Sequence, residues 1–153
     1  MRKTVAFAAL QMSLFLALPV SAQAQTVQQV FQEFGLIGVW ARVCNQPASI
    51  DSGNSHAIYS RMSADGVMLT YDNGPKYKPS VFAIVSARRA AANQLVYVEE
   101  RVPDKLRVTI TVQKSADEIS VLSSVMDDGK VLVKDGRFTA TGSVNPRQTR
   151  CGV

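Results

Sequence analysis

Short stretches of alternating apolar and polar residues recur along most of this chain, and they constrain its fold more than any other feature. The clearest is residues 105–114, in which Leu106, Val108, Ile110 and Val112 alternate with polar neighbours. Successive side chains of a strand point to opposite faces, so this period of two predicts a strand with one buried face. Similar β-rich stretches occupy 39–44, 56–62, 67–71, 80–87, 94–101, 119–126, 130–134 and 138–143.

Turn-forming residues separate these stretches at short intervals. Examples are Asp72-Asn73-Gly74-Pro75, Asp127-Asp128-Gly129 and Asp135-Gly136, in which Asn-Gly and Asp-Gly pairs tolerate the positive φ of hairpin turns. Short strands joined by tight turns indicate an antiparallel sandwich or barrel, and closure into a barrel removes exposed sheet edges. We therefore expect an all-β fold, an antiparallel meander of about eight strands closing into a small barrel. Residues 87–93 are interpreted as a strand end and loop.

One short helix is expected before the strands. Within residues 25–37, apolar side chains recur at steps of three and four residues, which is typical of one buried helix face. Thr26 suits the N-cap, and Gly35 and Gly38 bracket the expected end of the helix. We expect this amphipathic helix to lie against a barrel domain that spans residues 38–153.

The first 24 residues have the pattern of a secretory signal peptide. Arg2 and Lys3 precede an apolar run over 5–20. Ala22 and Ala24 then place small residues at positions −3 and −1 of a cleavage site, as signal peptidase requires. We predict cleavage after Ala24, with cleavage after Ala22 as the alternative. A retained anchor is disfavoured because polar residues and a proline interrupt the run. The prediction is a periplasmic or secreted protein with no membrane anchor after cleavage.

The chain has two cysteines, Cys44 and Cys151, and an exported protein most often pairs its cysteines. The alternatives are a metal site and a reactive thiol. Structural zinc requires four nitrogen or sulfur ligands, and two cysteines with the single histidine, His56, make a poor set. We therefore predict a Cys44–Cys151 disulfide and no metal site.

The charge is mildly positive and scattered. The formal net charge of the whole chain is +5, and removal of Arg2 and Lys3 with the signal peptide lowers it to +3. Arg88-Arg89 is the only adjacent basic pair in the rest of the chain. Nucleic-acid binding requires clustered positive charge and stacking aromatics on one face, so we predict no nucleic-acid partner.

Acid–base catalysis lacks a convincing set of residues. His56 lies near a loop rich in Ser, Gly and Asn, without a defensible nucleophile or acid beside it, and is interpreted as an ordinary strand-edge histidine. Glu99 and Glu100 are adjacent in a predicted strand and therefore face opposite sides. The pair Asp127-Asp128 lies in a predicted turn. We predict that the protein is not an enzyme and uses no cofactor.

The chain resembles the calycin superfamily of lipocalin-like barrels. The resemblance rests on Gly38-Val39-Trp40 at the opening of the first strand, after a short helix and before a meander of about eight strands. The family's later Thr-Asp-Trp-like turn is absent, because Trp40 is the only tryptophan. The resemblance implies that Trp40 lies under the barrel floor, packed against an arginine (Arg137 or Arg150), and that the barrel binds a small apolar ligand.

Two functions follow as hypotheses. The first is an exported β-barrel that binds a small apolar or amphipathic ligand in a cavity lined by Phe82, Ile84, Tyr97 and Leu122. Trp40 is interpreted as a structural plug whose N–H bonds to backbone, and a ligand contact is the alternative. The second function is a periplasmic protein-binding barrel, such as a protease inhibitor. A lysozyme inhibitor is disfavoured because lysozymes are usually basic and like charges repel.

The segment 71–79 combines aromatic residues with cations. In the protein-binding hypothesis it frames the open end of the barrel and contacts a partner. The alternative is a solvated hairpin, because most loops are wet and variable.

Overall fold

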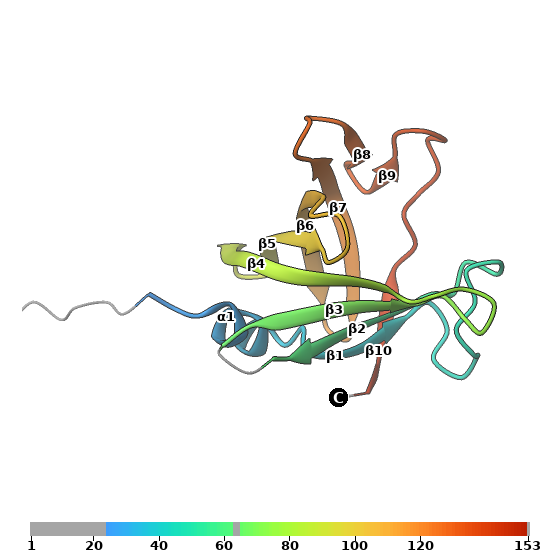
Figure 1. The fold of residues 1–153 in the computed structure, drawn as a ribbon, viewed down its shortest axis with the longest axis horizontal. Helices are drawn as coiled ribbons and strands as arrows, with labels where there is room; N and C mark the ends of the chain where they lie inside the picture. Colours follow the sequence, from blue (N-terminus) through green and yellow to red (C-terminus); the bar gives the residue numbers. More distant parts are fainter. Residues whose placement is uncertain (1–23, 63–64, 153) are drawn as a thin grey trace, which may run out of the picture.

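The computed structural model describes residues 24–62 and 65–152, and it shows one helix and ten strands in a single sheet (Figure 1). The predicted signal peptide, residues 1–24, lies outside the described residues except for Ala24. The elements are α1 (Val27–Phe34), β1 (Gly38–Ala41), β2 (His56–Arg61), β3 (Val67–Asp72), β4 (Ser80–Ala91), β5 (Gln94–Arg101), β6 (Arg107–Ser115), β7 (Glu118–Met126), β8 (Val131–Lys134), β9 (Arg137–Phe138) and β10 (Gln148–Gly152).

The sheet closes on itself. Strands β1 to β9 pair in sequence order, each antiparallel to the next, and β10 returns to pair with both β1 and β7. Eight strands, β1 to β7 and β10, therefore form a closed antiparallel barrel, while β8 and β9 extend from β7 outside the ring (Figure 1). The predicted all-β barrel with one short helix is confirmed.

The closure between β7 and β10 is short, and we call it the seam. Only two residue pairs join these strands, Gln148 with Ile119 and Thr149 with Glu118. Farther along β7, the strand pairs with β8 and no longer with β10, through Ser124 and Val125. The chain between β9 and β10 runs back to the barrel as a largely irregular segment (Figure 1). The barrel wall is therefore least continuous at the seam.

Helix α1 covers one end of the barrel, beside the turns that join β2 to β3, β4 to β5 and β6 to β7 (Figure 1). Thr26 caps its first turn through a capping box with Gln29, and Gly35 ends it in the left-handed conformation with φ 73°. The helix lies within the predicted range 25–37, and its eight residues make about two turns, as expected. Arg89 Nη2 and Lys114 Nζ donate to the carbonyls of Glu33 and Phe34, which places positive charge at the helix C-terminus.

The hydrophobic core consists of residues from α1 and of inward side chains from the strands. The buried positions of the strands follow the alternation seen in the sequence. Inward side chains of β3, β5 and β6 are buried at every second position, while their neighbours are more exposed. The largest fully buried side chains are Trp40, Tyr97, Phe31, Leu36, Leu69, Leu95, Val67, Val112 and Asn54.

Three segments differ from the sequence prediction. The strand Gln148–Gly152 was not predicted, since it has no apolar alternation and is held by pairing to β1 and β7. Strand β4 runs through most of the expected loop 87–93 because β5 pairs with it as far as Ala91. The expected strand 138–143 is mostly turn, and only Arg137–Phe138 pairs with β8.

The predicted disulfide is confirmed. Cys44 and Cys151 are bonded, with their Cα atoms 5.2 Å apart and 107 positions apart in the sequence. Cys44 lies in the loop that follows β1, and Cys151 lies in β10. The bond therefore ties the C-terminal strand to the start of the barrel, next to the seam.

Candidate functional site

The floor of the barrel is built around Trp40, whose side chain is 0% exposed. Its Nε1 donates a hydrogen bond to the carbonyl of Leu36 at 2.8 Å, which satisfies the buried N–H. The guanidinium of Arg150 lies over the indole at 5.9 Å from the ring centre, and its Nη2 donates to the carbonyl of Ile37. Arg137, the other predicted partner, instead donates to the carbonyl of Gly142. Trp40 is thus a plug bonded to backbone, as expected.

Aromatic side chains fill the interior above this floor. The hydroxyls of Tyr59 and Tyr97 are 2.9 Å apart and share a hydrogen bond, and both rings contact Phe31 from α1. Nearby, Tyr71 and Phe82 pack edge to face with ring centres 5.7 Å apart. The hydroxyls place polar atoms within an otherwise apolar interior.

Glu99 introduces an acidic group into the same interior. It is only 5% exposed, and its Oε2 is buried without a hydrogen-bond partner among the described residues. Burial raises the pKa of the Glu99 carboxyl to about 7. Glu100 points to the other face, where it pairs with Lys105 at 3.0 Å and Arg107 at 2.9 Å. The prediction that the two glutamates face opposite sides is confirmed.

Glu99 lies close to three tyrosines. Burial raises the pKa values of Tyr59, Tyr71 and Tyr97 well above the ordinary value for a phenol, and the negative charge of Glu99 raises all three further. All three phenols therefore keep their protons at neutral pH. Among the described residues, the interior therefore offers hydroxyl groups near a carboxyl group whose pKa is shifted by burial and by no neighbouring cation.

A cavity of about 180 Å³ lies at the seam. Tyr59 and Tyr71, two of the three tyrosines on which the charge of Glu99 acts, contribute to its wall. It reaches the surface at Pro146, which is exposed. A dry cavity of about 150 Å³ can hold benzene, so this one has room for a single-ring molecule. Its lining residues are Tyr59, Tyr71, Val112, Ile119, Val121, Asn145, Pro146 and Gln148.

The four residues predicted to contact a ligand lie elsewhere. Ile84 and Tyr97 are buried in the core, Phe82 is half-buried against Tyr71, and Leu122 is half-buried on β7. None of the four lines the seam cavity, so their role as ligand contacts stays a prediction. If the side chains of β7 alternated regularly back from Met126, Leu122 would point into the barrel. A β-bulge in the pairing of β6 with β7 interrupts this count and places Val121 opposite Val112.

The sequence interpretation missed the interior position of Glu99. The signal was present, because Leu95, Tyr97 and Glu99 occupy alternate positions of one strand and all three are buried. Alternation predicts which face of the strand carries Glu99. It does not predict whether a hydrogen-bond partner lies there, because such a partner would belong to another strand.

The remaining polar candidates lie in separate elements of the fold. His56 is half-buried, with its Nε2 3.4 Å from the side-chain nitrogen of Asn54. Asp127 and Asp128 lie in the turn between β7 and β8, where Asp128 Oδ1 accepts from the backbone N–H of Lys130. Within residues 24–62 and 65–152, no three His, Cys, Asp or Glu side chains are grouped to hold a metal.

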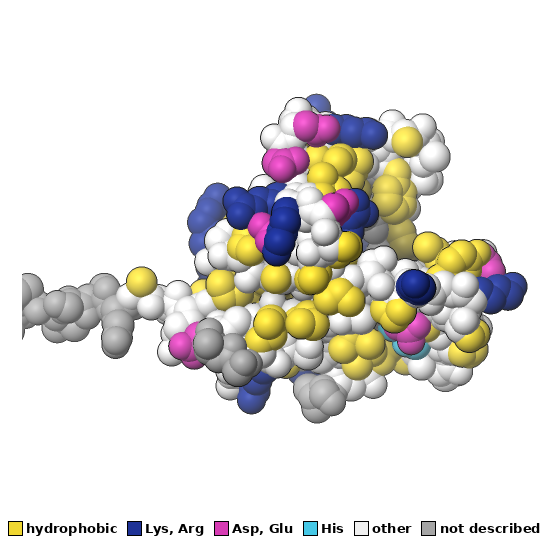
Figure 2. Space-filling view, in the orientation of Figure 1, with side chains coloured by type: hydrophobic (Ala, Val, Ile, Leu, Met, Phe, Trp, Pro, Cys, Tyr) yellow, Lys and Arg dark blue, Asp and Glu magenta, His cyan; other side chains and the backbone are white. Residues whose placement is uncertain are grey.

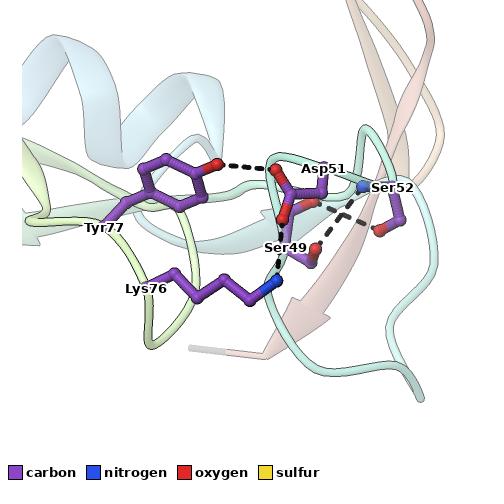
Figure 3. A network of polar contacts seen from close by, with 5 residues as sticks. All are labelled: Ser49, Asp51, Ser52, Lys76 and Tyr77. Carbon is purple, nitrogen blue, oxygen red and sulfur yellow. Dashed lines mark hydrogen bonds and ion pairs between the residues drawn. The ribbon is translucent and has the colours of Figure 1, made fainter.

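The loop 73–79 docks on the loop after β1 (Figure 3). Tyr77 donates its hydroxyl to Asp51 Oδ1 at 2.7 Å, and Lys76 Nζ lies 3.4 Å from Asp51 Oδ2. Gly74, with φ 92°, packs so tightly that a Cβ there would lie 2.5 Å from the carbonyl oxygen of Ala48. These contacts fix the position of a loop whose proposed role in partner binding stays a prediction.

The fold and the site together define a small disulfide-bonded antiparallel β-barrel, closed at one end by a helix, with a cavity at a short seam and a few polar groups in an apolar interior. Comparison with protein-family models, with curated proteins and with solved structures finds no match to this chain. Helix α1, with eight residues, is the only helix in the described part of the chain and is too short to cross a membrane.

The buried Glu99 leads to a prediction about pH and stability. In the folded state its carboxyl stays protonated up to a pH of about 7, compared with the ordinary value of 4.5. The folded state binds more protons between these values, so its free energy of unfolding should fall as the pH rises through this range. At about 1.4 kcal/mol per pH unit, the loss is on the order of 3 kcal/mol.

Glu99→Gln preserves the shape of the side chain but cannot ionise. We expect this variant to lose that part of the pH dependence and to exceed the wild type in stability at about pH 8. Urea unfolding at about pH 5 and about pH 8 measures the difference. Glu33→Gln, on the exposed side of α1, is the matched control and should follow the wild type. A wild-type protein whose stability rises over this range would contradict the prediction.

Proposed function

We propose that this chain is an exported barrel protein that binds a small amphipathic molecule at the seam cavity. The observation that carries the proposal is the seam cavity, which shares two wall residues with the surroundings of a buried carboxyl that has no hydrogen-bond partner among the described residues. Two tyrosines, Tyr59 and Tyr71, line the cavity and also feel the charge of Glu99. Native proteins rarely leave a buried polar atom without a partner, and binding sites are among the exceptions.

Export is supported by two features that are independent of the cavity. Residues 1–24 have the charged start, apolar middle and small-residue end of a signal peptide. The Cys44–Cys151 disulfide is typical of proteins that fold in an oxidising compartment. We therefore place the mature protein in the periplasm or outside the cell.

A relationship to the calycin superfamily is part of the proposal. It is supported by the barrel of eight antiparallel strands and by Trp40 on its floor, where Arg150 packs on the indole. Ligand binding inside the barrel is what this resemblance implies. Fold alone does not determine function, so the proposal relies on the cavity and its polar groups.

The size and lining of the cavity restrict the ligand. A volume of about 180 Å³ is below the usual range for drug-sized ligands and is close to that needed by one aromatic ring. Val112, Ile119 and Val121 would contact the apolar part of such a molecule, and Tyr71 offers a hydroxyl. The hydroxyl and the amide side chains at the cavity favour an amphipathic ligand over a purely apolar one.

A cavity-filling substitution tests this function. Benzyl alcohol is titrated into the mature, disulfide-bonded protein and followed by NMR chemical shifts. We expect Val121→Phe to fill the cavity and weaken binding by at least about tenfold, because the ring would compete with the ligand for space. Val85→Phe, at an exposed position of β4, is the matched control and should bind as the wild type does. Undiminished binding by Val121→Phe would refute the assignment of the cavity.

Binding of a protein partner is the second candidate function. It is favoured by the docked loops, which present Ile50 at 48% and Tyr77 at 47% exposure on a fixed framework. On the face shown in Figure 2, Lys and Arg side chains lie in separate groups near Asp and Glu and do not form a stripe. Native mass spectrometry of protein purified from its own host separates the candidates. A bound small molecule supports the first, and a stoichiometric protein supports the second.

A further inference from the structure

We infer that the ligand of the seam cavity is an uncharged single-ring molecule that carries a carboxamide or lactam group, and that Gln148 binds this group. The inference rests on the proposed function and specifies the chemical class of the ligand. Support comes from the direction of the Gln148 side chain, from the hydrogen-bonding groups left free at the cavity, and from the uncharged lining.

The side chain of Gln148 points into the barrel. Gln148 lies directly opposite Ile119 in the pairing of β10 with β7, and residues directly opposite each other carry their side chains on the same face. Ile119 is buried in the core, so this face is the inner one. Two positions farther along β10, Arg150 lies over the buried ring of Trp40, in agreement with the alternation of side chains along a strand. Gln148 therefore presents a carboxamide to the seam cavity that it lines.

Two hydrogen-bonding groups at the cavity are left free within the described part of the chain. The carboxamide of Gln148 and the hydroxyl of Tyr71 make no hydrogen bond to another described residue, although both side chains are half-buried. Tyr71 lies opposite the buried Ala57 and therefore also faces the interior. The hydroxyl of Tyr59, by contrast, is paired with that of Tyr97 at 2.9 Å. Since both free groups line one cavity of about 180 Å³, a single small molecule can reach both.

The described residues that line the cavity carry no charge. Val112, Ile119 and Val121 form its apolar part, and Glu99 does not belong to the lining. Burial raises the pKa of Tyr71 well above the ordinary value for a phenol, so its hydroxyl stays neutral. An ion that entered the cavity would lose its hydration without an opposite charge to pair with, which is costly. The cavity therefore favours an uncharged ligand.

A carboxamide or lactam matches these groups better than a ketone or a hydroxyl does. The side chain of Gln148 offers both an acceptor oxygen and N–H donors. A ligand amide has the same two functions side by side, so it can donate to the Gln148 oxygen and accept from the Gln148 N–H in one planar pair. The Tyr71 hydroxyl can donate to the second lone pair of the ligand carbonyl. A ketone has no donor and would leave the Gln148 oxygen unpaired, at a cost in affinity.

Five probes built on one ring test the inference. Benzamide, acetophenone and benzoate have nearly the same shape but carry N–H donors, a methyl group and a negative charge, respectively. Toluene and benzyl alcohol are the apolar and hydroxyl references. Each probe is titrated by calorimetry into the mature, disulfide-bonded protein at neutral pH. We expect benzamide to bind at least about fivefold more tightly than acetophenone, and benzoate not to bind. A purely apolar cavity would give the opposite order, because acetophenone is less polar than benzamide.

Gln148→Met keeps the length of the side chain but removes the carboxamide. We expect this variant to bind acetophenone at least as tightly as benzamide, and still to bind toluene. Gln46→Met, at an exposed position of the loop after β1, is the matched control and should keep the wild-type order. A Gln148→Met protein that keeps the preference for benzamide would overturn the assignment of Gln148.

The outcomes separate the inference from the proposed function. If benzyl alcohol binds but benzamide binds no more tightly than acetophenone or benzoate, the inference is overturned and the proposed function stands. If none of the five probes binds, both are overturned. The comparison of probes on the wild-type protein needs no variant, so a Gln148→Met protein that fails to fold does not prevent the test.

Discussion

Replacing Trp40 with alanine is expected to lower the free energy of unfolding by about 3–5 kcal/mol, the usual cost of removing a large aromatic side chain from a core. The indole is fully buried under the barrel floor, so the substitution leaves a large void that the surrounding strands cannot refill. It also leaves the carbonyl of Leu36 without its buried donor and removes the ring on which Arg150 packs. Urea unfolding followed by circular dichroism measures the loss.

Two milder substitutions separate these contributions. Trp40→Phe keeps part of the ring volume but loses the N–H donor, and we expect it to cost less than the alanine variant. Arg150→Lys keeps the charge but loses the planar group that lies over the indole. If Trp40→Ala lowers stability by less than about 1 kcal/mol, Trp40 is not the structural plug of the barrel.

Removing the disulfide should have an effect of similar size. In the chain-entropy model, a bond that closes a loop of 107 positions stabilises the folded state by roughly 4–5 kcal/mol. The double variant Cys44→Ser, Cys151→Ser should therefore melt at a much lower temperature under oxidising conditions. Locally, the bond reinforces a short C-terminal strand that pairs with β1 at three positions and with β7 at only two.

The control for the disulfide is the wild-type protein in the presence of a reducing agent, which should melt with the double variant. Both should keep the same ligand preference as the oxidised protein at temperatures where they are folded, because neither cysteine lines the seam cavity. An unchanged melting temperature for Cys44→Ser under oxidising conditions would show that the bond does not stabilise the fold.

Most of the architecture could be predicted from local patterns. The alternation of Leu106, Val108, Ile110 and Val112 gives the face of a strand directly, because side-chain direction in a strand depends only on position. Thr26 and Gly35 mark the ends of the helix through contacts within a few residues of each. These features need no knowledge of distant segments.

The features that were missed depend on pairing between distant segments. Strand β10 has a polar sequence with no strand pattern, and it exists because two other strands and a disulfide hold it. The bulge in the pairing of β6 with β7 decides that Val121, and not Leu122, lines the cavity. Neither register nor bulges can be read from one strand alone.

The sequence by itself determined a chain of short antiparallel strands, with a helix before them and two cysteines at the ends of the barrel domain. Tertiary structure alone decided that the barrel closes by a short seam, that a cavity lies there, and that Glu99 is buried near three tyrosines with no hydrogen-bond partner for its Oε2 among the described residues. The physical reason is that alternation specifies which way a side chain points, whereas its neighbours and their charges come from strands far away in sequence. The chemistry proposed for the site depends on those neighbours.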